Sequence, residues 1–266
     1  MSRARILMSR ENRLSGILFA PEKKVPSRSW PLMKGRNTRL PSNSVSWAAK
    51  VLAVTRKDIT AEFRTRYAIN SILMFALVTL TVISVALGIS TPDSDLMAAL
   101  FWVILFFASM SGLAQVFIRE EESGTALILK LSTDGLVIFF GKLIFNLLLL
   151  TILSILIVPL FIILLKVTPQ NWAIFLVGLI LGDIGLAGAT TIIAAIVAKA
   201  TVKGTLFTVL SFPILLPLLL AVIEITKVAF GGGGFADISL PLQVLIPYDV
   251  VMVTISVMLF DFVWRQ

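Results

Sequence analysis

Long apolar stretches that hold few charges recur six times along the chain. They cover residues 69–89, 96–117, 143–165, 172–198, 206–225 and 248–264. Each is close to the roughly 20 residues that a helix needs to cross a hydrocarbon core of about 30 Å. Lipid offers the backbone no hydrogen bonds, so a chain crossing it in such stretches must be helical. The pattern predicts an all-α membrane protein with six spans.

The composition supports lipid as the main solvent and narrows the possible chemistry. Of the 266 residues, 58% are hydrophobic and 14% charged, with a mean hydropathy of +0.98, whereas a soluble domain carries about 25% charged residues. The chain has no Cys and no His, which removes the commonest metal ligands and the commonest general base. We therefore expect neither a catalytic residue nor a metal site, and we do not expect a soluble enzyme.

The net charge of +8 lies mostly on one flank. Fifteen of the 23 Lys and Arg residues precede position 67, together with four of the 15 acids, which suits a membrane surface better than nucleic acid. With the amino terminus inside, 21 basic residues face the cytoplasm, and only Lys166 and Lys227 lie outside. The positive-inside rule therefore predicts that both termini are cytoplasmic, and we expect the plasma (cell inner) membrane.

The first 45 residues differ from the rest. They hold ten basic residues, two acids and four of the 11 prolines, which favours a disordered, lipid-associating tail over a packed domain. Two alternatives stay open: a targeting segment, which would place the protein in an organellar inner membrane, and a start assigned too early, with Met8 or Met33 as the true beginning. We expect a tail over 1–45 and a six-span domain over 46–266.

Two further segments adjoin the predicted spans. Residues 47–66 place apolar Ala48, Leu52, Ile59 and Phe63 apart from most charges, which predicts an amphipathic helix lying in the membrane interface. A plain extension of the first span is the alternative.

Residues 227–246 combine four glycines with a short apolar piece, which indicates a flexible hinge and a re-entrant or interfacial segment. Pro247 then suits the first turn of the last span, with Asp249 at the positive end of its dipole.

The loop between the second and third spans is the most informative segment, FIREEESGTALILKLSTDGLVIFFGKLIFN. Three acids precede Thr125, a possible helix cap, and an apolar run that could dock in a groove of another protein. An ordinary solvated turn is the alternative.

The run from Gly135 to Leu143 superficially resembles a phosphate-binding loop, but it has five residues between its glycines and no Ser or Thr after Lys142. Any ATPase must therefore be a second chain.

Ionisable residues inside spans are functional candidates because lipid disfavours them. Asp183 lies near the middle of the fourth span, beside Gly178 and Gly182, whose spacing permits close helix contact. It could line a substrate path, bind a proton, or form a buried hydrogen bond to a neighbouring helix. Pro213 and Pro217 should kink the fifth span and free carbonyl groups.

Three runs resemble the CcmB family, the membrane subunit of the haem-exporter-type ABC transporter of cytochrome c maturation. They are KDITAEFRTRYAINSILMF, the loop described above, and LILGDIGLAGATTIIAAIVAKATVKGTLFTVLSFPILLPLLL. The resemblance covers about residue 47 to the end and implies an ABC exporter-permease fold with a cytoplasmic coupling helix. Asp183 departs from it, since the family usually has a small or hydroxyl residue there.

The resemblance implies a non-catalytic subunit that binds a CcmA-like ATPase, which would hold ATP and Mg, and works with CcmC, CcmD and CcmE-like haem-handling proteins. Haem would be a handled or transported ligand, and a homodimer is open. The residues implied for ATPase coupling are Arg119, Glu120, Glu121, Glu122, Gly124, Leu127 and Leu131. An export permease for a lipid, drug or polysaccharide, and an ATP-independent carrier using Asp183, are the alternatives.

Overall fold

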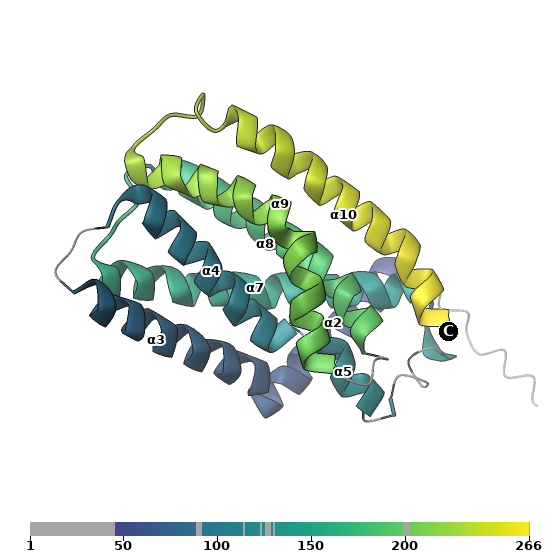
Figure 1. Cartoon of the computed structure of the whole chain (residues 1–266). Helices are drawn as coiled ribbons and strands as arrows, with labels where there is room; N and C mark the ends of the chain where they lie inside the picture. The colour runs from purple at the N-terminus through teal and green to yellow at the C-terminus, as the bar shows by residue number, and fades with distance from the viewer. Residues whose placement is uncertain are drawn as a thin grey trace, which may run out of the picture. The chain divides into compact units, whose positions relative to one another are not determined.

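The computed structural model describes residues 46–88, 92–113, 115–122, 124–125, 129, 131–198 and 203–265. The tail over 1–45 therefore lies outside the described residues. Within the described part the chain is helical and without strands (Figure 1). Its helices are α2 (Trp47–Thr65), α3 (Tyr67–Leu87), α4 (Ser94–Leu113), α5 (Gln115–Glu122), α7 (Gly135–Leu165), α8 (Trp172–Val197), α9 (Lys203–Gly231) and α10 (Ser239–Arg265).

Six of these helices, α3, α4, α7, α8, α9 and α10, are long and apolar enough to cross a membrane. They run alternately up and down, so that α2, α5 and the end of α10 lie at the same end of the bundle (Figure 1). The predicted all-α fold with six spanning helices is confirmed, and the protein is a multi-pass membrane protein.

Helix α8 is the centre of the bundle. Within its most apolar window 78% of the residues are buried, against 17% in α3 and in α10, and α8 packs on α7, α9 and α10. Glycines make these contacts close: a Cβ at Gly182 would lie 2.1 Å from the Trp102 ring of α4, and one at Gly178 would lie 2.9 Å from Ile225 of α9. The residues flagged by their helix-contact spacing thus lie where neighbouring helices approach the α8 backbone.

The last span begins earlier than the sequence indicated. Residues 239–246, which we expected to be re-entrant or interfacial, form the first two turns of α10, so that expectation is wrong. Pro247 lies inside the helix rather than in its first turn, and Asp249 is correspondingly far from the helix start. A broken backbone is costly in lipid, whereas a proline inside a spanning helix removes one hydrogen bond only.

The glycine run after α9 is a bonded turn rather than a loose hinge. Gly232 has a positive φ of 77°, the left-handed conformation that glycine adopts without strain. The backbone N–H of Gly234 donates to Asp237 at 2.8 Å, and the Asn171 side chain donates to the carbonyl of Gly233 at 3.1 Å. The turn is therefore held to the start of α8.

Helix α2 is a separate helix and not an extension of the first span. Arg66, with φ 52° and ψ 20°, ends α2 and precedes α3, and the Glu62 carboxylate accepts a hydrogen bond from the backbone N–H of Ile69 at 3.1 Å. The face that packs on α7 carries Val51, Val54, Thr55, Asp58 and Glu62. The predicted apolar residues Leu52 and Phe63 are exposed and face away from the bundle, and the interfacial position of α2 stays a prediction.

Candidate functional site

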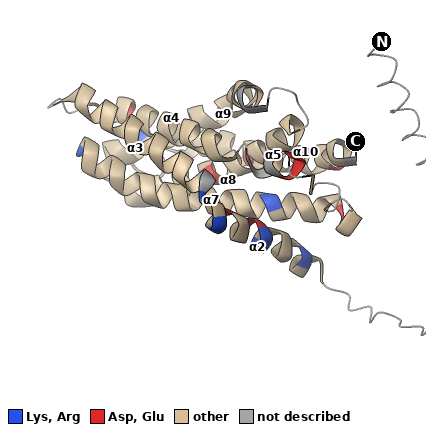
Figure 2. Cartoon of the chain, turned by 90° about the horizontal axis from the view of Figure 1, so that it is seen from below, with Lys and Arg blue, Asp and Glu red and all other residues tan. Residues whose placement is uncertain are grey.

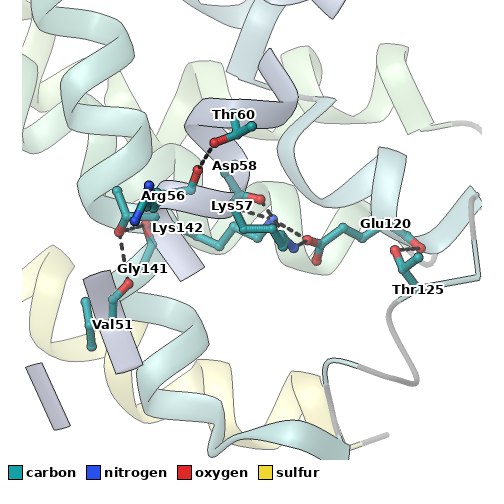
Figure 3. Close-up of polar contacts among 10 residues, drawn as sticks. Val51, Arg56, Lys57, Asp58, Thr60, Glu120, Thr125, Gly141 and Lys142 are labelled. Atoms are coloured by element: carbon teal, nitrogen blue, oxygen red, sulfur yellow. Dashed lines mark hydrogen bonds and ion pairs between the residues drawn. The ribbon is translucent and has the colours of Figure 1, made fainter. Parts of the chain in front are cut away.

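A buried lysine ties three separate segments together at the α2–α5 end of the bundle. Lys142 of α7 is 1% exposed, and its ammonium nitrogen lies 3.0 Å from Oδ2 of Asp58 in α2 and 2.8 Å from Oε1 of Glu120 in α5. Lys57 of α2 pairs with the same Glu120 oxygen and lies 3.3 Å from Asp58 (Figure 3). We call Lys57, Asp58, Glu120 and Lys142 the charged junction.

The charges of this junction support one another. Burial alone would raise the pKa of Glu120, but Lys142 and Lys57 outweigh burial and hold that pKa below its ordinary value of 4.5. Burial would likewise lower the pKa of Lys57, but Asp58 and Glu120 outweigh it and raise that pKa above 10.5. Glu120 and Lys57 are therefore both ionised throughout the neutral range.

Close packing of α2 on α7 brings Asp58 within reach of Lys142. A Cβ at Gly141 would lie 2.7 Å from the Val54 side chain, so only a glycine allows α2 to sit this near. The Thr55 hydroxyl donates to the carbonyl of Gly141 at 3.0 Å and fixes the contact (Figure 3). Gly141 and Lys142 lie inside helix α7, which agrees with their exclusion as a phosphate-binding loop.

Aromatic rings extend the junction towards α10. The Lys142 ammonium lies 5.3 Å from the ring centroid of Phe117 in α5, within cation–π distance. Phe117 in turn packs on Phe260 and Trp264 of α10, with ring centroids 5.8 and 5.9 Å away. The end of the last span is thereby connected to the same buried lysine.

The acidic run of the loop divides into an inner and an outer part. Glu120 is buried at 7% exposure, whereas Glu121 and Glu122 are exposed. Charged residues gather at this end of the bundle (Figure 2). Gly124 is exposed with a φ of 68°, and the hydroxyl of Thr125 donates to the carbonyl of Glu120 at 3.4 Å. The structure thus separates a residue that binds inside the protein from two that face outwards.

The remaining residues of the expected coupling site are only partly visible. Leu131 is 82% exposed, while Leu127 and the Arg119 side chain lie outside the described residues. Most of the predicted coupling helix therefore falls outside the described part of the chain. Leu131 nevertheless presents an apolar side chain on the same loop as the two outward acids.

Sequence reasoning missed Lys57, Asp58 and Lys142 as partners of Glu120. One signal was present: Val51, Thr55, Asp58 and Glu62 recur at helical spacing, so the two acids share the face that packs on α7. Nothing in the spacing, however, relates Asp58 to a lysine 84 positions later, and Lys142 was read as a boundary of the third span rather than a residue buried within its helix.

A second polar contact lies among the spans. Asp183 of α8 is 4% exposed and accepts a hydrogen bond from the Ser154 hydroxyl of α7, at 3.0 and 3.1 Å to its two oxygens. Pro213 and Pro217 lie inside α9, where the Tyr248 hydroxyl of α10 donates to the carbonyl of Ile214 at 2.8 Å. These side chains join neighbouring spans.

Six spanning helices, with buried ion pairs that join α2, α5 and α7 at one end, define a multi-pass helical membrane protein. The family model described as CcmB protein matches residues 49–263, and the chain belongs to the CcmB family. It is accordingly a permease subunit of the haem-exporter ABC transporter of cytochrome c maturation. A comparison with curated proteins finds no match.

Proposed function

We propose that this permease subunit binds a separate cytoplasmic ATPase of the CcmA type through the loop that carries Glu121 and Glu122. The observation that supports it is the division of the acidic run: Glu120 is fastened inside by Lys142, so the two following acids are presented outwards from a rigid base. Exposed acids beside the apolar Leu131 suit a partner groove with a basic rim. ATP and Mg would be held by that partner.

The charged junction gives the loop a means to transmit movement. Separating one partner of a buried ion pair leaves an uncompensated charge, which typically costs about 3–5 kcal/mol. Displacement of α5 by a bound ATPase would therefore carry Lys142 of α7 and Asp58 of α2 with it rather than break the pairs. In this scheme ATP binding or hydrolysis in the partner moves a spanning helix of this chain.

The role in haem handling follows from the family, and composition limits its form. Strong axial haem ligands are His, Cys thiolate, Met and Tyr, and the chain contains neither His nor Cys. We propose that this subunit acts with CcmC, CcmD and a CcmE-like chaperone to hand over haem, and that it does not itself store haem tightly.

Co-purification of the ATPase from the intact transporter tests the docking surface. Glu121→Lys combined with Glu122→Lys should lower the amount of bound ATPase about tenfold or more, because both exposed charges then repel a basic rim. Glu224→Lys is the matched control, since Glu224 is an exposed acid of α9 near the opposite end of the bundle. Equal ATPase retention by the double variant and the control would contradict the proposed surface. Glu120 is unsuitable for this test because its replacement would disrupt the junction itself.

A further inference from the structure

Asp249 is a buried carboxyl group of the last span. It lies in α10 at 6% exposure, and neither of its carboxyl oxygens has a hydrogen-bond partner among the described residues. Asp183, the other acid buried among the spans, differs because it accepts a hydrogen bond from Ser154. Among the described residues, the hydrogen-bonding capacity of Asp249 is thus unused.

The position of Asp249 is fixed by a glycine on the central helix. A Cβ at Gly185 would lie 2.3 Å from Oδ1 of Asp249 and 2.0 Å from Leu218 of α9. Gly185 lies at the middle of α8, so the carboxyl group sits about halfway through the bundle where α8, α9 and α10 meet. The missing side chain at Gly185 makes the space that Asp249 occupies.

No charge on the packed helices compensates Asp249 among the described residues. On α8, Asp183 is two residues from Gly185 and so points about 200° away, towards α7. The other groups are committed or remote: Tyr248 donates to Ile214, Lys227 pairs with Asp95, Lys142 belongs to the charged junction, Glu224 lies near the outer end of α9, and Asp261 lies three turns further along α10.

A carboxylate in apolar surroundings with neither a cation nor a donor is strongly disfavoured, and such a group normally takes up a proton and becomes neutral. We propose that Asp249 is a proton-binding site that holds α10 against α8. The neutral acid packs on Gly185, whereas the ionised acid would seek water and loosen the seam between these helices. No residue of the ATPase-docking surface takes part.

The seam next to Asp249 is built to close tightly. One turn further along α10, Val253 lies 3.3 Å from the position of a Cβ at Gly188, and the Ser256 hydroxyl donates to the carbonyl of Gly188 at 3.4 Å. Ser256 is fully buried. A small outward movement of α10 at Asp249 would therefore expose Ser256, which makes it a reporter of the seam.

Infrared spectroscopy of the purified full chain in lipid nanodiscs tests proton binding directly. At neutral pH the difference between the wild type and Asp249→Asn should show the loss of a protonated carboxyl C=O band. Asp183→Asn, the control, should leave that band in place. Loss of carboxylate bands instead would overturn the proposal. Failure of Asp249→Asn to fold would also count against it, because asparagine imitates the neutral acid in size and charge.

Thiol labelling tests the effect on the seam. The chain has no cysteine, so Ser256→Cys supplies a single site whose reaction with a membrane-permeable maleimide is followed as the pH is raised. Labelling should rise several-fold more in the Asp249 background than in the Asp249→Asn background, and the comparison cancels the pH dependence of the thiol. Equal labelling in both backgrounds at every pH would show that ionisation of Asp249 does not open the contact.

Discussion

At the scale of single residues, Lys142 shows how a charge can be accommodated in a helix that spans a membrane. A lysine at the centre of a spanning helix costs about 2.5–3.5 kcal/mol on insertion scales. Lys142 lies within two turns of the start of α7, and Asp58, Glu120 and the Phe117 ring surround its ammonium group. The lysine therefore stabilises the bundle only as long as both acids accompany it.

Replacing Lys142 tests this dependence. Lys142→Ala removes the buried cation of Asp58 and Glu120 and leaves them only the partly exposed Lys57, so we expect a loss of up to about 3–5 kcal/mol in the free energy of unfolding. The midpoint of thermal unfolding in detergent should fall clearly. Lys50→Ala, which removes an exposed lysine of α2, should leave the midpoint unchanged. A midpoint equal to that of the wild type for Lys142→Ala would mean that the junction contributes nothing to stability.

At the scale of elements, α8 holds the bundle together because its glycines admit large neighbours. The Trp102 ring of α4 rests on the backbone at Gly182, and its indole N–H donates to the Thr226 hydroxyl of α9 at 2.7 Å. The Trp102 side chain of α4 thereby contacts both α8 and α9. Helix α4 keeps its place only while α8 offers no side chain at that position.

A double-mutant cycle measures this contact. Gly182→Ala should destabilise the protein by about 1–3 kcal/mol, since its methyl group would overlap the Trp102 ring. Trp102→Phe removes the ring atoms that the methyl group meets, so in this background Gly182→Ala should cost clearly less. Thermal unfolding of the four proteins gives the coupling energy. Additive effects would show that the two residues do not meet.

The spanning helices were predictable from the sequence, but their boundaries and the contacts of the acidic loop were less so. The existence of all six spans followed from apolar length, because lipid leaves a chain few alternatives to helices. The boundaries were less predictable. Helix α7 begins at Gly135 and includes Lys142, whose charge is paired with residues distant in sequence, and α10 continues through Pro247. The acidic loop was recognised as a site, but the inward turn of Glu120 depends on tertiary contacts that no local pattern records.

At the scale of the whole molecule, the bundle has two chemically different ends. The charged junction, the outward acids and the end of α10 lie at one end, and the α9–α10 turn with the Lys227–Asp95 pair lies at the other (Figures 1 and 2). This separation agrees with the charge asymmetry of the sequence. Under the positive-inside rule we therefore expect the first of these ends to face the cytoplasm.

Cysteine labelling checks this orientation in a chain that has no native cysteine. Gly234→Cys, in the exposed turn before α10, should react with a membrane-impermeant maleimide in intact cells, whereas Glu122→Cys should react only after permeabilisation. Both positions are exposed, so burial does not explain a difference between them. Labelling of Glu122→Cys in intact cells would reverse the orientation and would contradict a cytoplasmic ATPase contact.

Pro247 gives the last helix a pivot. Its ring nitrogen cannot donate to the carbonyl of Gln243, so α10 bends more readily there than elsewhere along its length. Asp249 lies just beyond this pivot, and Phe260 and Trp264 at the far tip contact Phe117 beside Lys142. The part of α10 that follows Pro247 can thus swing as a lever arm, and its tip rests on the ring beside the charged junction.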